Sequence, residues 1–423
     1  DFKDLDISES FTSGSTAGYK LTNSTIADKV SRTIDVSPHA LPYLIRISKG
    51  NPTLFRLLMT HGFNSPSSEE NPYIVEVVPK QWNKRRVIIK HHFGDVLCQR
   101  TIAKYIKNRL KRWGIDIDIG QSVHQDVLRL FADSYATIDL SDASDRISPS
   151  LVKLLLPLDW YLMLKRLTNK YVKIKGEDHV FEINKFCGQG NGFTFELETL
   201  IFFVISSIAV KRNGQDPKAV FVYGDDTIVP EASAHAVMDA YEKCGLKVNK
   251  SKSFATGPFK ESCGFDVYDG FICRPVYFKD FKPNENKAIS IIKLHNRTFA
   301  VLEYLFSDIK FNSIGYRSIL QLRECFNKVS RFFGPPEIGD SVLFCRDEYP
   351  KWEDQRAYYR AYRRIYEKSQ YVMPSEDEAS ELAYIHLASD SRGSLPKNSR
   401  YKLRSSRMYG FVNANWQYNT GRA

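Results

Sequence analysis

The amino-acid sequence predicts a mixed protein of the α+β class. Three stretches carry this prediction: a hairpin-like pair of apolar runs at 220–230, a short strand at 136–140, and a strongly apolar helix that ends at Val210. At 423 residues the chain is longer than one compact core usually allows. We therefore expect two or three subdomains around a shared cleft.

The composition indicates a folded protein with a polyanionic partner. Hydrophobic residues make up 43% of the chain, the formal net charge is +11 and the pI is near 9.1. Residues 80–112 hold eleven Lys and Arg against one acid, and the tail after Asp390 holds seven and none. Aromatic residues lie within both segments, a mixture typical of single-stranded nucleic-acid binding. A solvated basic face remains the alternative for either segment alone.

Other classes of protein are disfavoured. The longest apolar run, 200–210, is about half the length of a membrane-spanning helix, and no signal peptide is visible, so we expect a soluble intracellular protein. The seven cysteines form an odd set without a CxxC pair. They are predicted to be reduced and mostly buried thiols, rather than a disulfide framework or a zinc site.

The sequence VFVYGDDTIVP, at 220–230, places two carboxylates inside an apolar hairpin. Gly224 suits the first central position of a type II′ turn, which puts Asp225 at the tip and Asp226 in the returning strand, where Asp is disfavoured. An ordinary exposed turn explains one aspartate easily and two adjacent ones less well. A divalent cation explains both, because Mg²⁺ and Mn²⁺ prefer carboxylate oxygens.

A second acidic group occurs in YATIDLSDASDRIS, at 135–148. Asp139 lies within or at the end of a short strand, and Ser141 begins a turn or helix that carries Asp142 and Asp145. By itself this segment would be a helix N-terminus with favourable acids in its first turn. Combined with the hairpin, it suggests two strands that present carboxylates to a pair of metal ions. Such a pair can activate a 3′-hydroxyl and stabilise a pyrophosphate leaving group.

The segment CGQGNGFTFELETLIFFVISSIAVKRNG, at 187–214, lies between the two acidic groups. Its glycines at 188, 190 and 192 predict a mobile loop, followed by a core helix. The segment has neither the P-loop nor the dinucleotide-binding pattern. The polar residues Asn191, Thr194 and Glu198 are its functional candidates.

These segments together resemble the motifs of viral RNA-dependent RNA polymerases. ATIDLSDASDRIS resembles motif A, GNGFTFELETLIF motif B, VYGDDTIVP motif C, and residues 249–270 the region of motifs D and E. VVPKQWNKRRVII and NRLKRWGID resemble upstream finger segments. The match is to the replicase beta subunit of single-stranded RNA bacteriophages, the leviviruses, and it is strongest over 72–280. Asp142 and Lys90-His91-His92 depart from the family pattern, and we expect them to tune the site rather than abolish it.

The resemblance implies a right-handed polymerase. Its parts would be an N-terminal and fingers region at 1–130, a palm at 131–275 with a fingers insertion at about 165–188, and a thumb with a basic C-terminal region at 276–423. The palm would be an antiparallel sheet flanked by helices, with an RRM-like core. In the thumb, residues 353–368 have a helical pattern.

The resemblance also implies roles for individual residues. Asp139 and Asp225 would hold two Mg²⁺ ions, for which Mn²⁺ could substitute, with the Leu140 carbonyl and Asp226 in support. Lys252 would be the general acid, with Lys250 in reserve. The incoming nucleotide would contact Lys80, Lys84, Arg85, Arg86, Asp145, Gly190, Asn191 and Thr194. RNA would contact Lys104, Lys107, Arg109, Arg360 and Arg363, and Lys260 is a weaker candidate for a phosphate contact.

The implied activity is RNA-directed RNA polymerisation, replicating a phage single-stranded RNA genome in the cytoplasm of a bacterial host. The implied partners are RNA template and product, nucleoside triphosphates and the host elongation factors Tu and Ts, without a membrane. A reverse transcriptase is the nearest alternative, and Asp145 argues against it, because reverse transcriptases place a bulky side chain near the sugar. An RNA-binding protein that kept the fold and lost the chemistry is the other alternative. Retention of the aspartate cluster argues against that, since without metals such a cluster mainly repels itself.

Overall fold

The computed structural model describes residues 15–18, 29–81, 84–168, 170–273 and 294–297 and, by backbone alone, six short strands between 333 and 413. The chain divides into two units, residues 1–272 with 372–398, and residues 273–371 with 399–423. The side chains of the candidate site described below belong to the first unit. Within the described part of the chain, no helix combines the length and apolar character needed to cross a membrane.

The first unit is built around an antiparallel sheet with the strand order β5-β9-β8. Its strands are β5 (Tyr135–Ile138), β8 (Phe221–Tyr223) and β9 (Asp226–Pro230). Ile138 pairs with Thr227, and Tyr223 pairs with Asp226. This register brings the C-terminal end of β5 to the same edge as the β8–β9 turn.

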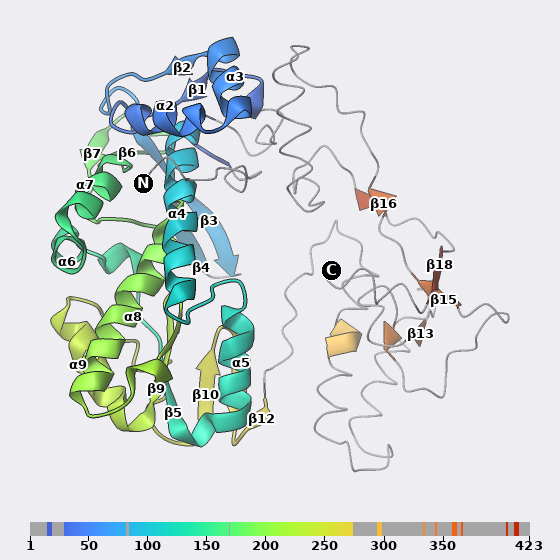
Figure 1. Ribbon diagram of the computed structural model, residues 1–423. Coiled ribbons are helices and arrows are strands. Elements are labelled where there is room, and N and C mark those ends of the chain that lie inside the picture. The colour runs from blue at the N-terminus through green and yellow to red at the C-terminus, as the bar shows by residue number, and fades with distance from the viewer. Residues whose placement is uncertain are drawn as a thin grey trace. The chain divides into compact units, whose positions relative to one another are not determined.

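Side chains alternate across this sheet, so its two faces join different cores. Ala136, Ile138 and Val229 belong to the main core, which also contains residues of α8 (Thr194–Arg212) and α9 (Ala234–Lys243). Ile228 belongs to a smaller core with residues of α5 (Gly120–Phe131) and β11 (Phe265–Tyr268). The sheet therefore lies between helices on one face and a helix with a hairpin on the other (Figure 1). This arrangement confirms the α+β prediction.

Helix α8 is the apolar helix that the sequence predicts. Its apolar residues are not confined to one face, and it is covered by the sheet, by α9 and by the 20-residue helix α4 (Phe93–Arg112). Figure 1 shows α4 running from the N-terminal helices toward α8. Because α8 is buried in this way, its first turn is held rigidly beside the hairpin.

A second sheet has the order β4-β3-β6-β7. Its strands are β3 (Tyr73–Gln81), β4 (Lys84–Lys90), β6 (Tyr171–Ile174) and β7 (Val180–Glu182). The β3–β4 hairpin extends beyond the small core of Tyr73, Ile89 and Val172, which leaves its basic end exposed.

The remaining elements are shorter. The N-terminal part contains β1 (Ile34–Asp35), α2 (Leu41–Lys49), α3 (Pro52–His61) and β2 (Phe63–Asn64). Between residues 132 and 272 the chain also forms the 3₁₀ turns η3 (Ala132–Ser134), η4 (Ser144–Arg146), η5 (Pro217–Ala219) and η6 (Glu231–Ser233), helices α6 (Pro149–Leu155) and α7 (Leu158–Arg166), and strands β10 (Phe259–Ser262) and β12 (Phe271–Ile272). The later strands are β13 (Phe333–Gly334), β14 (Leu343–Phe344), β15 (Tyr358–Ala361), β16 (Ile365–Tyr366), β17 (Leu403–Arg404) and β18 (Gly410–Asn413).

The helix expected over 353–368 is wrong for the part of that segment that the structure describes, because β15 and β16 are strands. Tyrosine-rich segments suit strands as well as helices, and β15 pairs with β18. The five described cysteines are all free, as expected, but only Cys98 and Cys187 are buried; Cys244 and Cys263 are partly exposed and Cys273 is exposed, so the prediction of mostly buried thiols is wrong for the described residues.

Candidate functional site

The aspartate pair lies at the turn between β8 and β9. Gly224 has a φ of +63° and Asp225 is not among the residues with positive φ, which confirms the predicted type II′ geometry. Asp225 is exposed at the tip, and Asp226 is the first residue of β9. The Gly224 amide donates to Thr199 Oγ1 of α8 at 3.0 Å, and a Cβ on Gly224 would lie 2.4 Å from the Phe195 ring. The buried helix thus fixes the position of the turn.

Asp139 reaches the same edge from the neighbouring strand. It directly follows β5, whose last residue pairs with Thr227, the neighbour of Asp226. Burial raises the pKa of Asp226 to about 7, and the charge of Asp225 adds to the effect. Burial also raises the pKa of Asp139, and Asp225 again contributes. The three carboxylates therefore share one region of negative potential.

A turn after the motif C hairpin holds Asp139 in place. Asn249 Nδ2 donates to Asp139 Oδ2 at 2.7 Å, and the Asn249 amide donates to the Asp139 carbonyl at 2.9 Å. Ser253 Oγ accepts from the Asp139 amide at 3.1 Å. The sequence does not reveal these contacts, because they join segments more than a hundred residues apart.

The same turn carries the candidate general acid. The Lys252 amide donates to the Asn249 carbonyl at 3.0 Å, and the Lys252 side chain is exposed. After burial, the charge of Lys252 has the largest effect on the pKa of Asp139, which it lowers. Lys250 is also exposed but is not among the groups that shift Asp139. This contrast favours Lys252 over Lys250 as the lysine near the carboxylates.

The carboxylate oxygens of the three aspartates are suitable ligands for a divalent cation. Carboxylates with raised pKa values are mutually repelling oxygen ligands, and a bound cation would relieve that repulsion. In the described residues, however, no three His, Cys, Asp or Glu side chains come close enough together to hold a metal by themselves. Leu140, the predicted carbonyl ligand, is buried and forms an isolated bridge with Val248. Phosphate oxygens of a substrate would be needed to complete the coordination.

The glycine loop before α8 is closely packed. Gly190 has a φ of +114°, and a Cβ there would lie 1.9 Å from the Ile89 carbonyl oxygen of β4. The Gly192 amide donates to Gln99 Oε1 at 2.8 Å, and Gln99 Nε2 lies 2.9 Å from His91 Nδ1. His91, one of the departures from the family pattern, is buried, and burial lowers its pKa to about 3. The neutral His91 thus supports the loop through Gln99.

The polar residues of this loop mainly bond to the loop itself. Asn191 Oδ1 accepts from the Phe193 amide at 2.9 Å, and Thr194 Oγ1 donates to the Gly188 carbonyl at 2.9 Å. Asn191 Nδ2 is buried without a hydrogen-bond partner in the described residues, so it retains a free donor. The hydrogen bonds of Asn191 and Thr194 therefore stabilise the conformation of the loop.

Two further charged residues lie beside the loop. Glu198, on the buried face of α8, has an Oε1 without a hydrogen-bond partner in the described residues. Burial raises its pKa to about 8, and Asp225 and Asp145 add to the effect. Lys185 Nζ lies 2.5 Å from Asp145 Oδ1. Glu198 stands out in the sequence as a charge in an apolar helix, whereas nothing in the sequence marks Lys185.

The lysine and arginine residues predicted to contact the triphosphate lie in different environments. Lys80 is exposed and its charge lowers the pKa of Asp139, so it lies near the carboxylates. Arg85 and Arg86 are exposed on β4, and the Lys84 side chain lies outside the described residues. These positions are compatible with phosphate binding.

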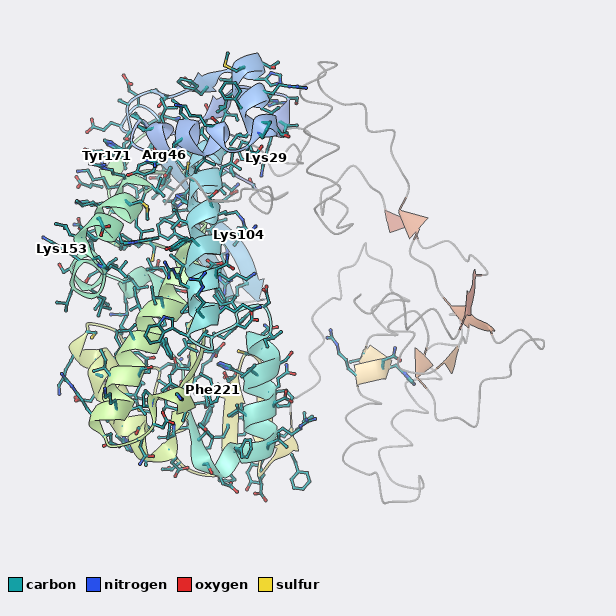
Figure 2. The ribbon with its side chains drawn as sticks, viewed as in Figure 1. Lys29, Arg46, Lys104, Lys153, Tyr171 and Phe221 are labelled. Carbon is teal, nitrogen blue, oxygen red and sulfur yellow. The ribbon has the colours of Figure 1, made fainter. Side chains whose placement is uncertain are left out.

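The predicted RNA contacts on α4 are partly engaged within the chain. Lys107 pairs with Asp118 at 2.6 Å, and Arg109 donates to the hydroxyl of Tyr105. Lys104 is half-buried on the same helix (Figure 2).

Three other predicted positions can be compared with the structure. Arg360 lies in β15 opposite Phe411, but its side chain and the whole of Arg363 lie outside the described residues. The phosphate contact considered for Lys260 is wrong, because that side chain is fully buried and lies 3.7 Å from Glu231.

The family described as RNA replicase, beta-chain, matches residues 1–302. The RNA-directed RNA polymerase beta chain of Escherichia phage MS2 is 34% identical over 344 residues, 78% of this chain and 58% of that protein. The RNA-directed RNA polymerase subunit beta of Enterobacteria phage SP is 37% identical over 204 residues, 48% of this chain and 35% of that protein.

The chain thus spans less than two thirds of the length of these relatives. Among solved structures, an insertion-loop deletion mutant of the RNA-dependent RNA polymerase of a human picorbirnavirus aligns with a TM-score of 0.41 and 16% identity. That alignment covers 59% of this chain and 56% of the other.

Proposed function

This chain belongs to the RNA replicase beta-chain family, and on that premise we propose that it is an RNA-directed RNA polymerase. It would extend the 3′ end of an RNA strand with nucleoside triphosphates on an RNA template, and so replicate a phage single-stranded RNA genome. One observation supports the proposal most: Asp139 lies at the same sheet edge as Asp225 and Asp226, and the charges of Asp225 and Asp139 both raise the pKa of Asp226.

Each carboxylate has a distinct role in this proposal. Asp139 and Asp225 would hold a pair of Mg²⁺ ions, with Mn²⁺ as a substitute, and Asp226 and the Leu140 carbonyl would support them. When bound there, such ions would supply Lewis-acid activation of the 3′-hydroxyl and would offset the negative charge of the pyrophosphate leaving group. Asn249 donates to the Asp139 carboxylate and Ser253 accepts from the Asp139 amide, contacts that would keep the carboxylate in one orientation toward the metal and substrate.

The nucleotide would bind between the basic hairpin and the glycine loop. Lys80, with Arg85, Arg86 and Lys84, would contact the triphosphate. Asp145 would accept a hydrogen bond from the ribose, and Asn191 and Thr194 would line the sugar and template side beside Gly190. Lys252, exposed on the turn beside Asp139, would protonate the leaving pyrophosphate.

The larger architecture and the partners are part of the same proposal. The central sheet and its helices would be the palm, the β3–β4 hairpin would belong to the fingers, and residues from 276 would form the thumb. RNA would contact α4 through Lys104, Lys107 and Arg109, and the later region through Arg360 and Arg363. The enzyme would act in the cytoplasm of a bacterial host, with the elongation factors Tu and Ts as partners.

Primer extension on an RNA template tests the proposal. The full chain, with and without added host factors, is given Mg²⁺ and either ribo- or deoxyribonucleoside triphosphates. We expect ribonucleotide incorporation that Asp225→Asn abolishes and Asp239→Asn, a control at an exposed helical ion pair, leaves unchanged. Preferential deoxyribonucleotide incorporation would instead identify a reverse transcriptase. RNA binding without extension would identify a binding protein that has lost the chemistry.

A further inference from the structure

Lys185 contacts the residue proposed to recognise the ribose. Its Nζ lies 2.5 Å from Asp145 Oδ1, across a sequence separation of 40 residues. The Lys185 side chain is 22% exposed and the Asp145 side chain 47% exposed. Within the described part of the chain, Asp145 Oδ2 has no hydrogen-bond partner. One carboxylate oxygen is therefore held by the lysine, while the other makes no hydrogen bond within the described residues and belongs to a half-exposed side chain.

The backbone around Lys185 is arranged for this contact. The Phe186 amide donates to the Ile147 carbonyl at 2.9 Å, which joins the segment before the glycine loop to the segment that follows η4. A Cβ on Gly188 would lie 2.9 Å from Lys185 Nζ, so glycine leaves room for the ammonium group. Thr194 Oγ1 holds the Gly188 carbonyl from α8. The lysine is thus enclosed by two segments that both belong to the candidate site.

The surroundings of the pair are acidic. Glu198 lies close enough to both Asp145 and Asp225 for each of them to raise its pKa. An aspartate in this environment is repelled by its neighbours, and an ammonium group on one oxygen opposes that repulsion. Charge-assisted contacts of this kind are short and directional, so the ion pair also limits rotation of the carboxylate.

We propose that Lys185 is a positioning residue that sets the preference for ribonucleotides, by holding Asp145 Oδ1 so that Oδ2 accepts a hydrogen bond from the 2′-hydroxyl. This role rests on the proposed polymerase function and concerns the same site. The ligand class is the ribonucleoside triphosphate. A deoxyribonucleotide lacks the hydroxyl group, so its binding gains nothing from an oriented Asp145.

Single-nucleotide incorporation by the full chain measures this preference. The kcat and KM are determined for matched ribo- and 2′-deoxyribonucleoside triphosphates, with wild type, Lys185→Met and Lys185→Arg. The control is Lys170→Met, which removes a similar lysine–carboxylate pair, with Glu182 at 2.7 Å, from an exposed sheet edge. Thermal unfolding of each variant reports whether the fold is kept.

Lys185→Met should lower the ratio of the two kcat/KM values roughly tenfold, as expected when one hydrogen bond to a charged group is weakened. The loss should arise mainly in KM for the ribonucleotide, with the deoxyribonucleotide unchanged. Lys185→Arg should restore part of the ratio, because the guanidinium can still donate to Oδ1. Lys170→Met should match wild type. An equal loss for both nucleotides, or an unchanged ratio, would overturn the proposal.

Equilibrium binding of the same two nucleotides gives a second readout that needs no turnover. A preference for the ribonucleotide that Lys185→Met abolishes supports the positioning role even if the wild-type chain extends no primer, in which case only the proposed polymerase function fails. Equal affinity of wild type for the two nucleotides would overturn the positioning role while leaving primer extension as an independent result.

Discussion

Glu198 offers a sharp test of the electrostatics of the site. It is 6% exposed, Oε1 has no hydrogen-bond partner in the described residues, and Asp225 and Asp145 lie near enough to disfavour its charge. Glu198→Gln preserves the shape of the side chain and removes its titration. The substitution should therefore change how the free energy of unfolding depends on pH.

The sign follows from the two pKa values. The pKa is raised from 4.5 to about 8 in the folded chain, so between these values the folded state binds more protons than the unfolded state. The stability of the wild type thus falls as pH rises through that window. Each pH unit contributes up to about 1.4 kcal/mol. Between about pH 5.5 and pH 7.5 we expect Glu198 to account for about 2 kcal/mol of the loss.

Urea unfolding with a metal chelator present measures the effect. As the pH rises across this interval, the free energy of unfolding of Glu198→Gln should increase by about 2 kcal/mol relative to that of wild type. Asp226 and Asp139 titrate in both proteins, so the difference between the proteins isolates Glu198. Glu177→Gln, at an exposed position, is the control, and its free energy of unfolding should differ little from that of wild type. A pH-independent difference for Glu198→Gln would refute the inferred burial of a titrating carboxyl group.

Three further predictions concern the loop, the Asp139 contacts and RNA. Gly190→Ala should lower the free energy of unfolding by about 2–3 kcal/mol in chemical denaturation, because its Cβ would clash with the Ile89 carbonyl. The control Gly176→Ala has a similar positive φ but open surroundings, so it should lose less stability. Equal losses for the two variants would contradict the packing argument. Asn249→Ala should weaken Mn²⁺ binding, measured by calorimetry, by about tenfold or more, because it removes the hydrogen bond that orients the Asp139 carboxylate. An unchanged affinity would show that Asn249 does not support Asp139 as a metal ligand. RNA affinity, measured by filter binding, should fall by about a hundredfold or more between about 50 and 200 mM salt, and a flat response would exclude phosphate contacts as its main source.

The sequence determined the local features around the aspartates. Gly224 could be placed in a type II′ turn because few residues tolerate positive φ, and α8 could be placed because its apolar run is long. Asp139 could be placed at the end of a strand by the same kind of local pattern. The order of the motifs then indicated the family, which the comparison with known proteins confirmed.

Local patterns failed where two conformations suit the same residues. The tyrosine-rich segment from 353 fits a helical period, yet Tyr358–Ala361 is a strand paired with β18. Lys260 was a weaker candidate for a phosphate contact, yet its side chain is buried beside Glu231. In both cases the deciding contact comes from a distant part of the chain, which a short window cannot include.

The sequence by itself thus determined which residues carry the charge and which strands and turns present it. Only the tertiary structure decided the surroundings of those charges: Asn249 donates to Asp139, Lys185 pairs with Asp145, and Glu198 is buried near enough to Asp225 and Asp145 for both to raise its pKa. The physical reason is that a carboxylate's orientation and pKa depend on donors and charges within a few ångströms. In this chain those neighbours come from segments that lie far apart in the sequence.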